Sequence, residues 1–339
     1  MLRKSLPPHG LACLSLLLLL LSGSRLEAQQ GGRASKSSPA APTAKPALFQ
    51  PGIINISAAT TYRPAFTADG RTVLYTLEVG GGDYLILESR FRNGRWQQPQ
   101  IAPFSGRYSD AEAFMWPGGN KLYFSSKRPV TPDGQPRKDY DIWTVERSSN
   151  GVWGAPQHLG GEVNTDLNEL YPSVTTQGTL YFSRSGPEGS DLWHARMANG
   201  QYIAAEKLEV PINSDNRDAG VFIAPDESFI IFESNRPGGL GNNDLYISHR
   251  RNNTWTPPQN IGAPINSPAN ETSAVISSDG CVLYFASNRK LETAAALGAG
   301  LTYADLLARL QTPGNGLWHI YHVQSGNLNG LSPTCRSKN

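Results

Sequence analysis

Apolar and polar positions alternate in five similar segments spread along the chain. Each is an apolar run, a tight polar turn and a second, alternating run, as in YRPAFTADGRTVLYT from Tyr62. The others begin at Glu112, Tyr171, Gly220 and Thr272. Two short runs joined by a two-residue turn predict a β-hairpin. Equivalent apolar residues recur 48, 58, 50 and 53 positions apart, at Tyr75, Tyr123, Tyr181, Ile231 and Tyr284.

Two further elements complete each repeat. A third run begins with Asp141, Asp191 or Asp244, whose carboxylates we expect to bind nearby backbone N–H groups. The last repeat has His319 at this position. A fourth element combines an aromatic residue with proline, as in Trp96–Pro99. Four strands at a period near 50 are typical of a β-propeller blade.

The pattern predicts an all-β protein, a single β-propeller of five four-stranded blades. The expected blades span about 62–110, 111–169, 170–218, 219–271 and 272–323, within a propeller domain at 47–335. Residues 48–56 resemble a fourth strand, which the last repeat lacks. We therefore expect this N-terminal strand to complete the last blade and close the ring. A sixth blade would need a repeat that the sequence does not contain.

The repeats resemble the TolB-type, WD40-like β-propeller family. The best matches to its motif are FTADG at 66–70 and SNRPGG at 234–239, and the resemblance covers roughly 49–323. It implies the propeller fold. The family includes periplasmic partner-binding propellers, propellers attached to peptidoglycan-binding or peptidase domains, and a few lyases, so the resemblance implies no single function.

The N-terminus predicts export. Arg3 and Lys4 precede an apolar run of about a dozen residues that is too short to span a bilayer, so residues 1–28 are predicted to be a signal peptide. Residues 29–46 have the composition of a flexible linker. Removing the leader leaves 30 − 3 = 27 basic and 28 − 1 = 27 acidic residues. We therefore expect the mature protein to be nearly neutral, periplasmic or secreted, and monomeric. We expect it neither to bind nucleic acid nor to insert stably into a membrane.

Acidic and basic residues recur in register with the repeats. Four acids precede the first strands, and four arginines lie at the ends of the second strands: Asp110, Glu169, Asp218 and Glu271, with Arg128, Arg184, Arg236 and Arg289. The first repeat has Thr61 and no arginine, so acid and arginine are present or absent together. This favours ion pairs within each blade. The alternative is a ligand-binding or Ca²⁺-binding ring at the channel mouth.

One segment departs from the repeat. Residues 290–316 replace the short turn between the second and third strands of the last blade. Tyr303, Leu306, Leu307 and Leu310 have helical spacing, with Thr302 as the expected N-cap and Pro313–Gly314 as the stop. Departures from a repeat mark function more often than the repeat does. We expect an amphipathic helix on the face of the acid–arginine pairs, as a lid, a docking element or a plug.

Other candidate chemistry is sparse. Cys281 and Cys335 are predicted to form a disulfide, as expected of an exported chain. No catalytic motif, metal-type spacing or cofactor motif occurs. We expect a non-catalytic propeller that binds a protein, peptide or glycan at the channel mouth. The alternative is a glycosidase or polysaccharide lyase using carboxylates there, which requires Glu169 and Glu271 to face the channel rather than arginine.

Overall fold

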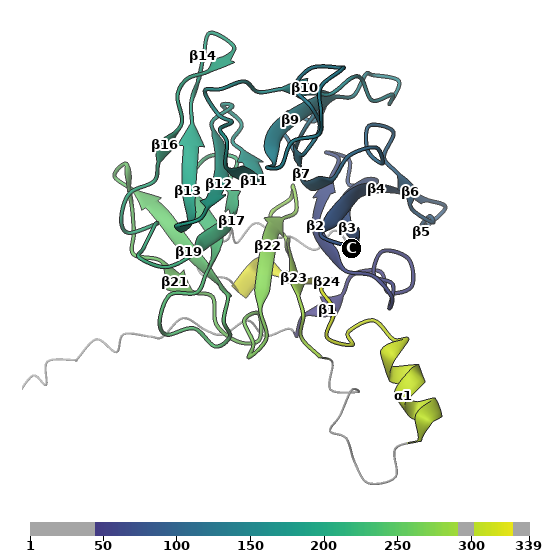
Figure 1. Ribbon diagram of the computed structural model, residues 1–339. Coiled ribbons are helices and arrows are strands. Elements are labelled where there is room, and N and C mark those ends of the chain that lie inside the picture. The colour runs from purple at the N-terminus through teal and green to yellow at the C-terminus, as the bar shows by residue number, and fades with distance from the viewer. Residues whose placement is uncertain (1–44, 291–301, 328–339) are drawn as a thin grey trace, which may run out of the picture. The chain divides into compact units, whose positions relative to one another are not determined.

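The computed structural model describes residues 45–290 and 302–327. These residues form five antiparallel blade sheets and a separate two-stranded ribbon, and each inner blade strand packs against the inner strands of neighbouring blades (Figure 1). The five-bladed β-propeller predicted from the repeats is confirmed. The predicted leader, most of the linker and Cys335 lie outside the described residues. Within the described part, no helix is long and apolar enough to cross a membrane.

Each blade runs outward from an inner strand. Blade 1 contains β2 (Thr61–Phe66), β3 (Thr72–Gly80), β4 (Asp83–Arg92), β5 (Arg95–Trp96) and β6 (Gln100–Ile101). Blade 2 contains β7 (Asp110–Met115), β8 (Lys121–Ser126), β9 (Asp141–Glu146) and β10 (Gln157–His158). Blade 3 contains β11 (Asn168–Val174), β12 (Leu180–Gly186), β13 (Gly189–Ala195) and β16 (Glu206–Lys207), with the side ribbon β14 (Met197–Ala198) and β15 (Gln201–Tyr202).

The last two blades follow the same plan. Blade 4 contains β17 (Asp218–Ile223), β18 (Phe229–Ser234), β19 (Asp244–Arg251), β20 (Thr254–Trp255) and β21 (Gln259–Asn260). Blade 5 contains β22 (Glu271–Ile276), β23 (Val282–Ser287) and β24 (His319–Gln324), followed by the 3-10 turn η2 (Ser325–Asn327). The predicted blade boundaries are displaced slightly, because each acid opens the next blade instead of closing the previous one.

The N-terminal strand closes the ring as predicted, but it is shorter than expected. β1 (Ala47–Leu48) pairs antiparallel with β24 as the outermost strand of blade 5. The remainder of the predicted strand at 48–56 forms turns, because Gln50 has a positive φ of 48° and Pro51 lacks a backbone donor. Asn55 then turns inward, and its Nδ2 donates to Phe49 O and Ile320 O.

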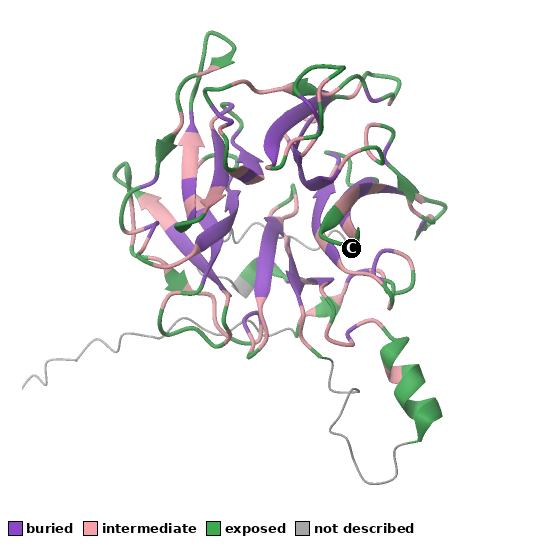
Figure 2. Cartoon of the chain, viewed as in Figure 1, coloured by how far each residue is buried: buried purple, intermediate pink, exposed green. Residues whose placement is uncertain are grey.

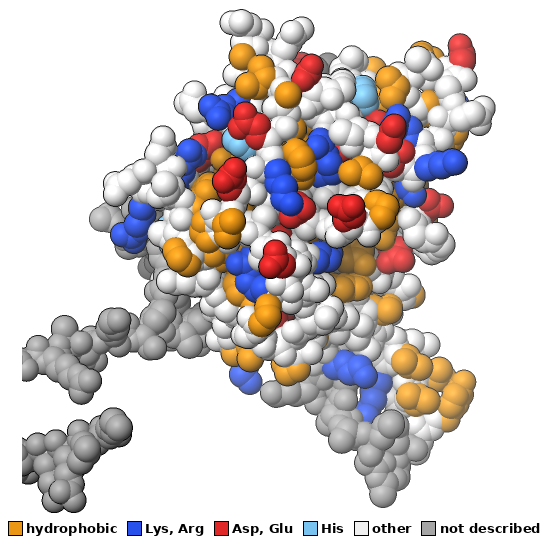
Figure 3. All heavy atoms as spheres, turned by 60° about the vertical axis from the view of Figure 1, so that its left-hand side comes forward, with side chains coloured by type: hydrophobic (Ala, Val, Ile, Leu, Met, Phe, Trp, Pro, Cys, Tyr) orange, Lys and Arg blue, Asp and Glu red, His pale blue; other side chains and the backbone are white. Residues whose placement is uncertain are grey.

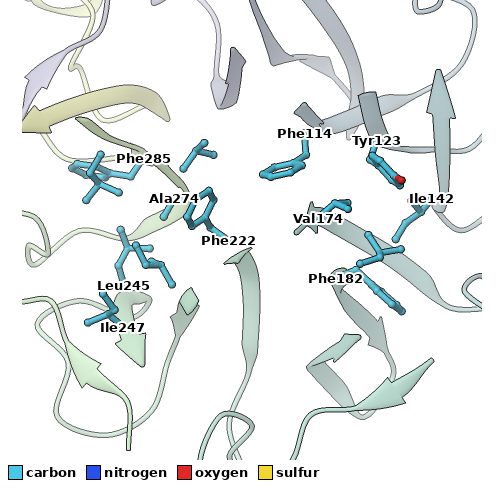
Figure 4. Close-up of a cluster of buried hydrophobic side chains, with 14 of the residues drawn as sticks. Phe114, Tyr123, Ile142, Val174, Phe182, Phe222, Leu245, Ile247, Ala274 and Phe285 are labelled. Carbon is cyan, nitrogen blue, oxygen red and sulfur yellow. The ribbon is translucent and has the colours of Figure 1, made fainter. Parts of the chain in front are cut away.

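The core lies between and within the blades. Figure 2 shows the inner strands buried along most of their length. Figure 4 shows Phe114 and Phe222 pointing toward each other from different blades, with ring centroids 6.3 Å apart. Burying a side chain of this size stabilises the fold by roughly 1.5–3 kcal/mol. The hydrophobic contacts thus fix the blades that hold the channel side chains.

The predicted helix is confirmed at its expected position. α1 (Tyr303–Leu310) begins after Thr302, whose hydroxyl and the Asp305 carboxylate form a capping box. No residue of α1 is buried (Figure 2), so the helix is not packed as a plug against the last blade. The segment leaves after Ser287 and returns at His319, and Ser287 pairs with Glu271 at the start of β22. It therefore belongs to the face where the inner strands begin.

Candidate functional site

The acid and arginine of each predicted pair lie together within one blade. The N–O distances are 2.6 Å for Asp110–Arg128, 2.7 Å for Glu169–Arg184, 2.7 Å for Asp218–Arg236 and 2.9 Å for Glu271–Arg289. All four carboxylates are fully buried. Burial raises the pKa of Asp110 and of Glu169, while the partner arginine opposes the shift.

These pairs satisfy their polar atoms inside the blade. Both oxygens of Glu271 accept hydrogen bonds, from Ser267, Ser287 and Arg289, and Arg289 also donates to Pro264 O. Glu169 likewise binds Thr165 and Arg184. Since Glu169 and Glu271 face arginine, neither fits the nucleophile or acid required by the enzyme alternative. The geometry favours a structural role, in which each acid–arginine pair joins the second strand to the loop that enters the blade. We call these four pairs staples.

The third-strand aspartates differ from one another. Asp244 accepts from Leu240 N and Gly241 N, as expected. Asp141 instead contacts Arg137 and His158, and Asp191 contacts Lys207 at 2.7 Å. His319 takes this position in blade 5 and is fully buried, and neither ring nitrogen has a hydrogen bond among the described residues. Burial lowers its pKa to about 4.

A different set of charged side chains lines the channel, which the sequence analysis missed. The inner strand of every blade has a β-bulge near its start, at the fourth residue of β11 and at the third residue of the other four. All five bulged residues have a positive φ: Arg63, Glu112, Tyr171, Gly220 and Ser273. Because a bulge re-aims side chains, this ring of equivalent positions supplies different chemistry from each blade.

Arg63 crosses the channel from blade 1. Its guanidinium donates to Pro172 O and Val221 O at 2.9 Å each, and it lies over the rings of Phe114 and Tyr171. Glu112 Oε2 lies 4.0 Å from Arg63 Nε. Burial lowers the pKa of Arg63. Burial also raises the pKa of Glu112 to about 7, opposed by Arg63 and assisted by the charge of Glu233.

Glu233 reaches the channel from the second strand of blade 4. Its Oε1 lies 2.6 Å from Arg217 NH1, whereas its Oε2 has no hydrogen-bond partner among the described residues, although Glu233 is only 1% exposed. Gly220 makes the room, because a Cβ there would lie 2.6 Å from Glu233 Oε2. Glu233 raises the pKa of Arg217.

These side chains surround a cavity of about 370 Å³, which we call the polar mouth. Its lining includes Tyr62, Tyr84, Tyr140, Tyr171, Trp318, Glu112, Arg217, Glu233, Asn243 and Thr272. The ring pairs Trp318–Tyr62, Tyr62–Tyr84 and Tyr84–Tyr140 have centroids 5.8, 6.2 and 6.5 Å apart, so they form a continuous aromatic arc. The opposite wall is polar and comes mainly from blade 4. Trp318 lies two residues after the end of the insertion in sequence.

The other end of the inner strands forms an apolar mouth of about 530 Å³. Phe66, Phe114, Trp116, Phe222 and Phe229 are among its lining residues. Arg63 and Glu112 lie between the two mouths along the inner strands. The channel is therefore charged and aromatic at one end and hydrophobic at the other.

Cys281 and the possible metal ligands His, Asp and Glu complete the candidate chemistry. Among the described residues, no group of three or more His, Cys, Asp or Glu side chains could hold a metal ion. Cys281 is disulfide-bonded. Its predicted partner Cys335 lies outside the described residues, so that pairing stays a prediction.

Comparison with known proteins gives structural neighbours only. No family model matches the chain, and no curated protein matches its sequence. Similar solved structures include a TolB candidate from Agrobacterium tumefaciens (17% identity, TM-score 0.45, covering 68% of this chain and 70% of that one). TolB from Acinetobacter baumannii is also similar (14% identity, TM-score 0.44, covering 67% of this chain and 49% of that one). A third similar structure is an α-L-arabinofuranosidase from Lactobacillus brevis (13% identity, TM-score 0.48, covering 80% of this chain and 91% of that one).

The chain is a five-bladed β-propeller with TolB proteins among its structural neighbours. It spans about half the length of the Acinetobacter protein. At these identities and TM-scores, the neighbours show the fold alone.

Proposed function

We propose that this protein is an exported, non-catalytic β-propeller that binds a protein, peptide or glycan ligand at the polar mouth. The observation that carries the proposal is the combination of an aromatic arc and buried charged side chains around one concave cavity. Ligand pockets combine apolar walls with a few placed polar groups in this way. The four acid–arginine pairs shape the rim of this face without contributing free polar atoms.

Charge and sequence support the class of ligand and the location. Basic and acidic side chains are interspersed on the face that Figure 3 shows, which does not favour a nucleic-acid partner. The predicted leader at 1–28 supports a periplasmic or secreted location. We expect the protein to act as a monomer.

Affinity capture from cell-envelope extract tests the proposal. The wild-type protein would be compared with Trp318→Ala, which shortens the aromatic arc, and with Val152→Ala, which removes a side chain that is 61% exposed and outside the polar mouth. We expect the captured species to be lost with Trp318→Ala and retained with Val152→Ala. Equal recovery with wild type and Trp318→Ala would show that the polar mouth is not the binding site.

The helical insertion needs its own variant. Its apolar residues Tyr303, Leu306, Leu307 and Leu310 are exposed, which supports a docking or lid role on the same face. Replacing residues 290–316 with a short turn should reduce recovery of the ligand while leaving the propeller folded. Unchanged recovery would remove α1 from the binding surface.

A carbohydrate-active enzyme is the second candidate. The observation that favours it is the presence of two carboxylates in the channel, of which Glu112 has a pKa of about 7 and Glu233 pairs with Arg217. Glycosidases use one protonated and one ionised carboxyl group. Release of nitrophenol from a panel of nitrophenyl glycosides, lost in Glu112→Gln, would support this candidate. No turnover by the wild-type protein would argue against glycosidase activity.

A further inference from the structure

The two walls of the polar mouth differ in chemistry. Trp318, Tyr62 and Tyr84 form one wall from blades 5 and 1, and their rings are only half-buried. Arg217, Glu233 and Asn243 form the facing wall from blade 4. A ligand that fills the cavity must therefore present an apolar face to one wall and polar groups to the other.

The polar wall contains buried acceptors that have no donor. Glu233 Oε2 and Asn243 Oδ1 are both buried and lack hydrogen-bond partners among the described residues. Leaving such an atom unsatisfied costs about 1–3 kcal/mol, and more where the group is charged. In the other four blades, the residue at the equivalent position of the second strand has a small side chain: Thr76, Ser125, Ser183 and Ala286. Glu233 is thus an exception, and its unpartnered Oε2 lies in the space left by the missing side chain of Gly220.

The formal charges on this end of the channel balance. Arg63 and Arg217 stand against Glu112 and Glu233, and Lys127 Nζ already lies over the Tyr140 ring at 4.7 Å. A strongly charged ligand would gain attraction from one pair member and repulsion from the other. A neutral ligand with both donors and acceptors avoids this conflict, since hydroxyl groups can do both.

We propose that the polar mouth binds a neutral sugar residue, with one face of the ring stacked on Trp318 and Tyr62 and its hydroxyls facing Glu233, Asn243 and Arg217. The hydroxyls donate to Glu233 Oε2 and Asn243 Oδ1 and accept from the Arg217 guanidinium. The cavity of about 370 Å³ lies at the small end of ligand pockets, which suits one or two sugar rings. This inference rests on the proposed function and narrows its ligand to the end of a neutral glycan.

Calorimetric titration of the folded propeller tests the inference. The probes are neutral gluco-, xylo- and manno-oligosaccharides, uronic-acid oligosaccharides, and short peptides. We expect at least one neutral series to bind. Trp318→Ala should weaken that binding about tenfold or more through loss of stacking area. Glu233→Gln should weaken it about tenfold, because a hydrogen bond to a charged acceptor is lost.

Two controls match these variants. Val152→Ala removes an exposed apolar side chain outside the mouth, and Arg71→Ala removes an exposed charge from a separate surface hollow. Both should change the affinity less than twofold. Circular dichroism and thermal unfolding of every variant establish that the fold is retained.

The outcomes separate the two proposals. Failure of every neutral series to bind at millimolar concentration overturns the sugar inference. Binding of uronic-acid oligosaccharides or peptides alone, sensitive to Trp318→Ala, also overturns it but leaves the proposed binding function intact. Neutral-sugar binding that is unchanged in Trp318→Ala and Glu233→Gln places the sugar elsewhere and overturns the assigned site.

Discussion

Two groups of charged side chains lie within the same five blades and behave differently. The acid–arginine pairs, such as Asp218–Arg236, occur in four blades, and each carboxylate is fully buried and fully hydrogen-bonded. The channel charges Arg63, Glu112 and Glu233 each occur once, and they have unpartnered atoms or shifted pKa values. Repetition with satisfied hydrogen bonds indicates a structural role, whereas a unique and unsatisfied charge indicates a binding role.

The difference follows from how the blades are built. Each staple arginine also donates to a carbonyl in the loop that enters its blade, as Arg236 does to Ile212 O at 2.7 Å. Four of the five blades have this connection, so its residues recur with the repeat. The channel has only one lining residue from each bulge, so chemistry there can vary from blade to blade without disturbing the sheets.

Breaking a staple should give the largest effect. Arg236→Met leaves the buried Asp218 carboxylate without its counter-ion, which typically costs about 3–5 kcal/mol of unfolding free energy. Urea denaturation at pH 7 measures this loss. The double variant Asp218→Asn with Arg236→Met should lose less, because no uncompensated charge remains. A loss below 1 kcal/mol in Arg236→Met would remove the structural role from the staple.

Sequence analysis could predict the fold and the staples, because both repeat. The period near 50 gave five blades, and the paired presence of acid and arginine identified the ion pairs. The N-cap Thr302 also followed from local chemistry alone. Such features depend on residues whose neighbours are fixed by strand pairing or by the helix itself.

The channel charges could not be predicted in the same way. A regular strand places residues i and i+2 on the same face, so Arg63 and Glu112 would share the orientation of Thr61 and Asp110. The bulge with positive φ breaks this rule, and nothing in the residues themselves reveals it. One signal was present: Glu233 departs from the small residues at its repeat position. Departures from a repeat mark function at Glu233 as well as at the insertion at 290–316.

Removing a channel charge should stabilise the fold at high pH, opposite in sign to breaking a staple. The folded-state pKa of Glu112 is raised to about 7. Its contribution to the free energy of unfolding is therefore present below pH 4.5 and is lost as pH rises through 7. Glu112→Gln should therefore be more stable than wild type at pH 8 by about 2–3 kcal/mol. Stability measured from pH 5 to 8 should fall in the wild type and stay flatter in the variant. Parallel curves would contradict the assignment.

His319 gives the corresponding test at low pH, in a repeat position that has aspartate in blades 2 to 4. Burial lowers the pKa of His319 to about 4. Its contribution to the free energy of unfolding is therefore present above pH 6.5 and is lost as pH falls toward 4. Between pH 7 and 5 the wild type should lose about 2 kcal/mol through this group. His319→Gln should remove that part of the acid sensitivity in urea denaturation. If both proteins lose stability equally, His319 is not buried in its neutral form.

The smallest effect is expected where the geometry looks the same but the burial differs. Lys207 lies 2.7 Å from Asp191, the same N–O distance as Arg236 from Asp218, yet the Lys207 side chain is 50% exposed and the Arg236 side chain is 15% exposed. Solvent screens the exposed pair and hydrates each partner when it is alone.

Lys207→Ala should therefore cost less than about 1 kcal/mol at low salt, and still less in 1 M NaCl, where the Debye length is about 3 Å. Urea denaturation at both salt concentrations, run beside Arg236→Met, measures the contrast. A loss in Lys207→Ala comparable to that in Arg236→Met would mean that proximity alone determines the strength of these pairs. A small loss would instead mean that burial determines how much a pair stabilises the fold. Burial is the property that distinguishes the staples from exposed ion pairs, and it is also the reason that unpaired charges in the channel destabilise the fold.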